Sequence, residues 1–141
     1  MLKPNFIAGE WVVGESGSVN RNPSDTNDVI GEYAEAGHQD TEHAIAAAHA
    51  AFAPWSRSSP ELRADILDRA GAEILARKDE LGQVLSREEG KTLVEGTGEV
   101  VRAGRIFKYF AGEALRMGGE RLPSVRPGIE VEIRREAEGV I

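Results

Sequence analysis

The chain has 141 residues, of which 40% are hydrophobic and 29% charged, a composition typical of a globular protein long enough to bury a core. Its net charge of −7, with no basic block to offset it, argues against a nucleic-acid or anionic-membrane surface. The absence of cysteine excludes disulfides, thiolate metal sites and thiol nucleophiles within this chain. No apolar run approaches the roughly 20 residues that span a bilayer, and the N-terminus lacks the apolar core of a signal peptide. We therefore expect a cytoplasmic protein with no nucleic-acid or membrane partner.

Short strands and turns are predicted over residues 1–36. Residues 6–8 and 11–13 are apolar and flank Gly9-Glu10, a two-residue connection typical of a short hairpin. Residues 14–17 and 20–28 are rich in turn-forming side chains and are expected to be loops. Residues 29–36 then favour a strand.

Three helices are predicted next. Asp40 can cap an alanine-rich helix that should end at Pro54, because the residue before a proline avoids the helical conformation. Residues 59–61 (Ser-Pro-Glu) have the chemistry of a helix start, and the helical pattern is expected to break near residues 78–79. Gly90 should stop the third helix.

A fourth, central helix is predicted to begin at Thr92, because Thr92 and Glu95 have the spacing of a capping box. Each glycine inside this helix costs about 1 kcal/mol of helix propensity relative to alanine, so the helix must recover that free energy through close packing. We expect it to be a core helix that ends near Met117. Its predicted apolar face consists of Val100, Ala103, Phe107, Phe110, Ala111, Ala114 and Leu115.

Neither a cofactor-binding residue nor a catalytic residue is predicted from spacing. Gly96 and Gly98 suggest a dinucleotide-binding turn, but position 101 is Val and no strand precedes them, whereas such glycines sit at a strand-to-helix turn. Glu88 and Glu89 are adjacent on a helix and point about 100° apart, which does not favour paired acid–base chemistry.

Residues 129–134 are the clearest strand, because apolar side chains alternate strictly with charged ones. Residues 123–128, with two prolines, precede it as a linker. The elements together predict an α+β fold with short N-terminal strands and a hairpin, about four helices and a terminal edge strand. The apolar face of that strand has no obvious local partner, so we expect the chain to self-associate through it.

Five segments, in order, resemble the N-terminal part of NAD(P)-dependent aldehyde dehydrogenases. Each is weak alone, but their common order is specific and covers nearly the whole chain. The resemblance stops before the family's cofactor glycines, its catalytic glutamate and its nucleophilic cysteine. The segments are Asn5-Phe-Ile-Ala-Gly-Glu-Trp11, Asn22-Pro-Ser24, the alanine-rich run 44–52, Glu88-Glu-Gly-Lys-Thr92 with Tyr109-Phe-Ala-Gly112, and Arg134-Arg-Glu136 with Gly139-Val-Ile141.

The resemblance implies that the full enzyme oxidises a small-molecule aldehyde through a cysteine thioester and passes hydride to NAD or NADP. The sequence is similar in character to dehydrogenases of 2-oxoglutarate semialdehyde. Residues 1–122 would flank the cofactor domain, and residues 123–141 would form a linker and the start of the oligomerisation strands of a homo-oligomer. We expect this fragment to lack a complete Rossmann-like sheet, to bind neither cofactor and to be inactive by itself.

The resemblance also implies a structural monovalent cation. In similar enzymes its ligands are a carboxylate just before a Gly-Lys pair and two carbonyls just before an Asn-Pro turn. The matching positions are Glu88 and the carbonyls of Asn20 and Arg21, which offer the oxygen ligands that hard cations take. Glu88 stands where the family often has the shorter aspartate, and the remaining ligand would lie beyond Ile141. The alternative is that Glu88 belongs to a solvated helix end.

Arg102 matches a position that lines the substrate entrance in similar enzymes. An arginine there could hold a substrate carboxylate through paired hydrogen bonds. The alternative is an exposed Arg102 that pairs with Glu95 or Glu99.

A free-standing scaffold or interaction module that associates through residues 129–135 is the alternative function. A reading frame that continues past Ile141 into the family's Trp-Asn-Phe-Pro segment would favour the enzyme.

Overall fold

In the computed structural model, residues 1–14 and 16–141 are described. Their strands pair as three separate antiparallel hairpins, β1–β2, β3–β4 and β5–β6. The α+β prediction, without a complete Rossmann-like sheet, is confirmed for this part of the chain. The elements are β1 Asn5–Ile7, β2 Glu10–Val12, β3 Ser16–Asn22, β4 Asp25–Glu35, α1 His38–Ser56, α2 Pro60–Ala76, α3 Lys78–Glu89, α4 Leu93–Ala114, β5 Glu120–Pro123 and β6 Glu130–Ile133.

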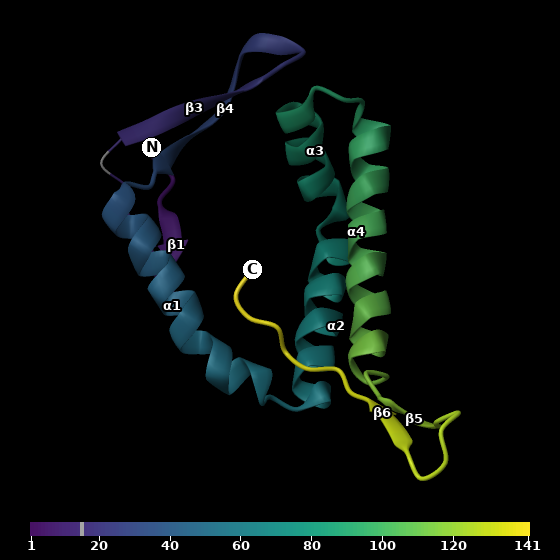
Figure 1. The fold of residues 1–141 in the computed structure, drawn as a ribbon. Helices are drawn as coiled ribbons and strands as arrows, with labels where there is room; N and C mark the ends of the chain where they lie inside the picture. Colours follow the sequence, from purple (N-terminus) through teal and green to yellow (C-terminus); the bar gives the residue numbers. More distant parts are fainter. Residues whose placement is uncertain (15) are drawn as a thin grey trace.

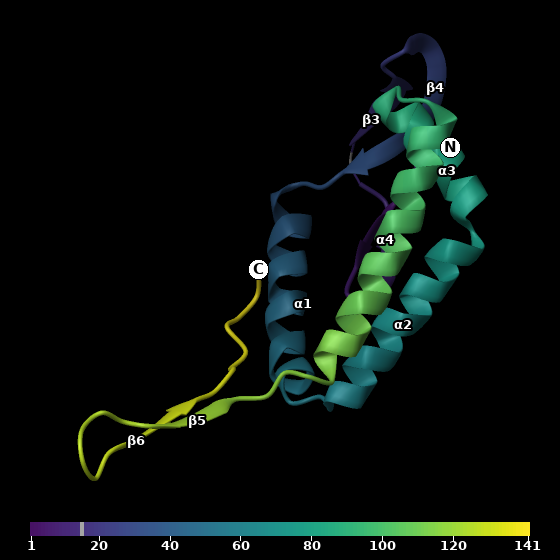
Figure 2. The same ribbon diagram turned by 90° about the vertical axis from the view of Figure 1, so that its right-hand side faces the viewer.

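Helix α4 organises the arrangement. It runs beside α2 along one half of its length and beside α3 along the other (Figure 1). Helix α1 lies across from this group and contacts β1, and the β3–β4 hairpin reaches from α1 to α3 (Figure 1). The β5–β6 hairpin extends beyond the end of α4, away from the helices (Figure 2).

The predicted starts of α2 and α4 and the predicted end of α3 are confirmed by their capping contacts. The Oγ atom of Ser59 accepts a hydrogen bond from the Leu62 amide at 3.1 Å, which starts α2. Gly90 ends α3 with a left-handed φ of 69°. Thr92 and Glu95 each accept a hydrogen bond from the other's backbone amide, which completes the capping box that starts α4.

The close packing predicted for α4 is a contact between its backbone and the backbones of α2 and α3. A Cβ placed on Gly71 of α2 would lie 2.8 Å from the carbonyl oxygen of Gly104. A Cβ placed on Gly96 of α4 would lie 2.8 Å from the carbonyl oxygen of Gly82 in α3. Any side chain at these positions would push the helices apart, so glycine is what permits α4 to contact both neighbours.

The predicted apolar face of α4 is only partly the buried face. Val100, Ala111 and Ala114 are buried, as expected. Phe110 and Leu115 are instead 54% and 61% exposed, because the glycine-containing side faces α2 and α3 and turns these large side chains outward.

The core of the described residues is thin. Its buried apolar side chains are Ile7, Ala64, Val100, Ala111 and Ala114, and no large side chain is fully buried. Large apolar side chains such as Trp55 and Phe110 lie at the surface, where they line a cavity of about 440 Å³ at the end of α2 and α4. Burial of small side chains stabilises little, so the expectation of a substantial core is wrong for this part of the chain.

The N-terminal hairpin is shifted by one residue from the prediction. Ala8 and Gly9 form its turn, both with positive φ (53° and 88°), as a type I′ turn requires. Glu10 therefore belongs to β2. Phe6 and Trp11 face each other across the strands with ring centroids 4.9 Å apart.

The loops predicted at residues 14–17 and 20–28 are largely strand. β3 begins at Ser16, and only Pro23 and Ser24 separate it from β4. Serine, glycine and asparagine are weak strand formers, but pairing with β4 and contact with α3 outweigh that preference. Glu15, within the first predicted loop, lies outside the described residues.

The ends of α1 differ from the prediction as well. Gly37 is the N-cap, so Asp40 lies in the first turn and does not cap the helix. The helix continues through Pro54 to Ser56, because a proline this close to the C-terminus removes one backbone hydrogen bond and leaves the last turn intact.

Helix α4 ends at Ala114, three residues before the predicted end at Met117.

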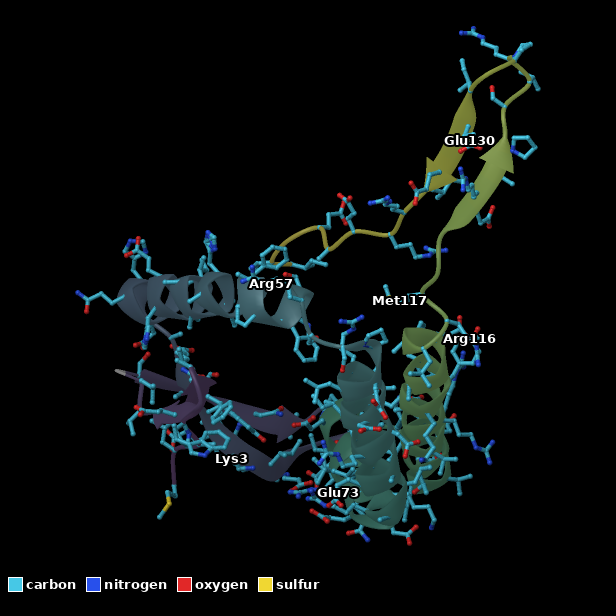
Figure 3. The ribbon with its side chains drawn as sticks, turned by 90° about the horizontal axis from the view of Figure 1, so that it is seen from below. Lys3, Arg57, Glu73, Arg116, Met117 and Glu130 are labelled. Atoms are coloured by element: carbon cyan, nitrogen blue, oxygen red, sulfur yellow. The ribbon has the colours of Figure 1, made fainter. Side chains whose placement is uncertain are left out.

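The terminal strand is confirmed as β6, but its partner β5 was not predicted. Residues 120–123 include one apolar side chain and a proline, which is a weak strand signal. Leu122 pairs with Val131, and every residue of both strands is exposed. The hairpin projects away from the helices and carries Glu130, which pairs with Arg121 of the facing strand (Figure 3).

We predict opposite effects of alanine at two glycines of α4. Gly96→Ala should lower the free energy of unfolding by about 1–3 kcal/mol, because the new Cβ overlaps Ser86 and the Gly82 carbonyl. No atom lies within 4 Å of the Cβ position at Gly98, so Gly98→Ala should raise it by up to about 1 kcal/mol through helix propensity. Urea unfolding followed by circular dichroism would measure both, and changes of the same sign would contradict the proposed packing.

Candidate functional site

The β3–β4 hairpin is tied to the point where α3 ends and α4 begins, which we call the α3–α4 junction (residues 86–92). The guanidinium of Arg87, in the last turn of α3, donates two hydrogen bonds to the carboxylate of Asp28 in β4. The N···O distances are 2.9 Å from Nε and 2.5 Å from Nη2. Nη2 also approaches the carbonyl oxygen of Val29 at 3.4 Å. This paired geometry holds a guanidinium in distance and in orientation.

Two further contacts complete this attachment. Asn20 Nδ2 donates to Glu88 Oε1 at 3.2 Å, and Ser24 Oγ donates to the carbonyl oxygen of Gly90 at 2.6 Å. Gly90 is required twice: its φ is left-handed, and a Cβ there would lie 2.9 Å from the Pro23 ring. The hairpin turn thus lies directly on the glycine that ends α3.

The charges at the junction are paired. Hydrogen bonds from Arg87 lower the pKa of Asp28 to about 2; burial opposes this effect, and a hydrogen bond from Asn22 adds to it. Lys91 contacts Glu89, and its Nζ lies 2.7 Å from a carboxylate oxygen of Glu99. The pKa of Lys91 is raised by its hydrogen bonds to these two carboxylates.

Two of the residues predicted to hold a cation, Asn20 and Glu88, meet in this region through their side chains. Pairing of β3 with β4 shifts register on both sides of Arg21, and such irregularities redirect backbone groups. Asn20 and Glu88 are in direct contact, while the Arg21 guanidinium donates to the carbonyl oxygen of Thr26 at 3.0 Å, toward the hairpin turn.

The donor set fits a hard monovalent cation. Its atoms are oxygens, and two cationic side chains close to Glu88 in sequence, Arg87 and Lys91, are neutralised by carboxylates. Residues 1–14 and 16–141 contain no group of three His, Asp or Glu side chains that could hold a metal by themselves. A ligand set here would therefore have to include backbone carbonyls, as the sequence predicts for Asn20 and Arg21.

Arg102 lies exposed on α4, apart from the junction. Its suggested partners are engaged elsewhere: Glu99 with Lys91, and Glu95 with Thr92 in the capping box. The substrate-carboxylate role of Arg102 and its alternative pairing with either glutamate both remain predictions.

The Asp28–Arg87 pair is a contact of this region that the sequence analysis missed. Its partners are 59 residues apart, and no local pattern joins them. Only a prediction of β3–β4 as a hairpin, docked on α3, could have placed the two side chains together.

Solved structures identify the class of protein to which this fold belongs. A betaine aldehyde dehydrogenase from Staphylococcus aureus, crystallised with NAD+, matches with a TM-score of 0.85 and 31% identity, over 95% of this chain and 28% of that one. An NAD-dependent benzaldehyde dehydrogenase from Corynebacterium glutamicum matches with a TM-score of 0.78 and 34% identity, over 91% of this chain and 28% of that one. The model of the Aldehyde dehydrogenase family matches residues 11–141, and the chain belongs to that family.

Among the curated relatives that the chain resembles are two semialdehyde dehydrogenases. An alpha-ketoglutarate semialdehyde dehydrogenase from Haloferax volcanii is 37% identical over 138 residues, 96% of this chain and 29% of the relative. An alpha-ketoglutaric semialdehyde dehydrogenase from Bacillus subtilis is 37% identical over 122 residues, 85% of this chain and 25% of the relative. The chain therefore spans little more than a quarter of the length of the relatives it matches. No helix in its described part is long and apolar enough to cross a membrane.

We predict that Asp28 stabilises the fold near neutral pH and that this stabilisation is lost at acid pH. Because the folded pKa of about 2 lies below the ordinary value of 3.8, the contribution is complete above the ordinary value and is lost as pH falls toward the folded one. Asp28→Asn should lower Tm near neutral pH, and the difference from wild type should shrink on acidification through this window. Thermal unfolding of both proteins across it would show this, whereas a constant difference would contradict it.

Proposed function

We propose that this chain supplies the N-terminal part of an NAD(P)-dependent aldehyde dehydrogenase that oxidises a semialdehyde acid to a carboxylate through a cysteine thioester. The observation that carries this proposal is the 37% identity to two alpha-ketoglutarate-type semialdehyde dehydrogenases, over 96% and 85% of the chain. The nucleophile would come from elsewhere in the longer protein, because this chain has no cysteine.

The cofactor would likewise be bound by other residues. Gly96 is buried against Ser86 and the Gly82 carbonyl, so it serves helix packing. Gly98 lies inside α4 and not at a strand-to-helix turn, where backbone amides meet a pyrophosphate. A similar enzyme was crystallised with NAD+, which supports NAD or NADP for the full enzyme.

Arg102 is the residue that we assign to the substrate's distal carboxylate. It is exposed on α4, and the glutamates near it already have other partners. A guanidinium presents paired donors that match a carboxylate, which suits a semialdehyde acid better than an uncharged aldehyde.

A structural monovalent cation would be held by Glu88 with the carbonyls of Asn20 and Arg21. The contact of Asn20 with Glu88 and the irregular β3–β4 pairing at Arg21 support this site. The cation would replace the Asn20 hydrogen bond and join the hairpin to the α3–α4 junction electrostatically.

The β5–β6 hairpin would contribute to a homo-oligomer. Val131 and Ile133 are 40% and 47% exposed, and the hairpin extends away from the helices (Figure 3). The same observation supports the alternative function, a module that associates through residues 129–135. The proposed division at residue 122 remains a prediction.

The isolated 141-residue chain should be catalytically silent. With no thiolate to form a thioester, it should reduce neither NAD+ nor NADP+ with any aldehyde, and calorimetry should detect no dinucleotide binding at millimolar concentration. Addition of the missing C-terminal part should be needed for activity. Aldehyde-dependent NADH formation that persists through rigorous purification would overturn the proposal.

The chain should associate in a concentration-dependent manner, and Val131→Lys should reduce this association by placing a charge on the apolar face of β6. Glu132→Gln, which adds the same charge increment on the opposite face of the strand, is the matched control. Light scattering would measure both. A wild-type chain that stays monomeric at high concentration would reject the role of the hairpin.

In the full enzyme, potassium should raise Tm more than a large organic cation does, and Glu88→Gln should weaken or abolish this increment by removing the carboxylate ligand. Glu89→Gln changes the adjacent carboxylate in the same way and should retain it. Thermal unfolding in potassium chloride and in tetramethylammonium chloride makes the comparison. An unchanged increment in Glu88→Gln would reject the site.

A further inference from the structure

The position of the β3–β4 hairpin on the helices depends on few contacts. Its two strands pair only with each other over most of their length, and most of their residues are exposed. A two-stranded hairpin is marginally stable by itself in water, and among the helices its strands contact α3. The Lys3 backbone bonds to Glu32 and Ala34, at the end of β4 away from the turn. Side-chain contacts with the α3–α4 junction therefore determine where the turn end of the hairpin lies.

The Asp28–Arg87 pair is next to both halves of the proposed cation site. Arg87 precedes Glu88 on α3. Asp28 precedes Val29, which is the strand partner of Arg21. A displacement of this ion pair would therefore change the separation between the Glu88 carboxylate and the carbonyls of the opposite strand.

We propose that Asp28 and Arg87 are a positioning pair for the cation site: their two-hydrogen-bond contact holds the Asn20 and Arg21 carbonyls opposite Glu88. The inference rests on the cation site proposed above. Neither side chain is a ligand. Residues that orient metal ligands typically alter metal affinity by 10- to 100-fold when they are changed, because ligand oxygens must be held within a fraction of an ångström.

The pair has an electrostatic consequence as well. Arg87 is adjacent to the ligand Glu88, and an uncompensated guanidinium would repel a cation there. Asp28 neutralises it at 2.5 Å. Asp28→Asn removes both the positioning and the neutralisation, whereas Asp28→Glu keeps the charge and a carboxylate that can still accept two hydrogen bonds.

A purely structural ion pair would behave differently. Its loss would lower Tm by the same amount in every salt, and the potassium concentration that gives half of the Tm increment would not change. A positioning pair must shift that half-effect concentration, which is therefore the quantity that distinguishes the two roles.

The experiment is a potassium titration of the full-length enzyme to which this chain contributes, with potassium chloride replacing tetramethylammonium chloride at constant ionic strength and Tm as the readout. Asp28→Asn should raise the half-effect concentration about tenfold or more. Arg87→Lys should also raise it, because lysine keeps the charge but loses the two-pronged contact. Asp28→Glu should restore most of the wild-type value. Asp68→Asn breaks the Asp68–Lys108 pair (2.7 Å) between α2 and α4 and should leave the concentration unchanged.

The outcomes separate the two proposals. If wild type shows no potassium increment, the cation site fails, and the positioning role fails with it. A second outcome is that wild type responds to potassium, that Glu88→Gln abolishes the response, and that Asp28→Asn and Arg87→Lys keep the wild-type half-effect concentration. In that case the cation site stands and the positioning role is overturned. If Asp28→Asn does not fold, the comparison of Arg87→Lys with Asp28→Glu decides the positioning role: the half-effect concentration should shift in the first variant and stay near the wild-type value in the second.

Discussion

The close approach of the α4 backbone to α2 and α3 is the constraint on which the rest of the structure depends. It requires glycine at Gly71, Gly82, Gly96 and Gly104, where an added Cβ would lie within 3 Å of a neighbouring atom. Glycine costs helix propensity, and the contact between helix backbones recovers free energy through packing. The same contact fixes the α3–α4 junction, because the helices on either side of Gly90 cannot slide past each other without a clash at Gly82 and Gly96.

The junction in turn locates the N-terminal hairpin. Arg87, Glu88 and Gly90 each contact a residue of the β3–β4 hairpin. Apart from the Lys3 backbone, which pairs with β4 at Tyr33, little else holds the hairpin. The core is small, and large apolar side chains such as Trp55, Phe110 and Val131 lie at the surface. A chain that spans little more than a quarter of its relatives would bury such side chains against the remainder of the enzyme, which supports the proposed role as one part of a larger fold.

The sequence predicted what local chemistry decides. Ser59, Gly90 and the Thr92–Glu95 pair identify helix ends because each satisfies nearby backbone groups. The α+β class and the family followed from element order and from short segments in a specific order. The β3–β4 hairpin and the Asp28–Arg87 pair were not predicted, because they depend on residues far apart in the chain. The outward orientation of Phe110 was not predicted, because the apolar face of α4 was assigned from hydrophobic side chains and not from the positions of its glycines.

We propose that this chain performs the N-terminal role of a semialdehyde-oxidising aldehyde dehydrogenase. A chimera tests this role, in which the chain replaces the corresponding segment of the Bacillus subtilis alpha-ketoglutaric semialdehyde dehydrogenase, which is 37% identical over that region. The folded chimera should oxidise 2-oxoglutarate semialdehyde with reduction of NAD+ or NADP+, while the chain alone should not. A chimera that folds and assembles as its parent does, yet has no activity, would contradict it.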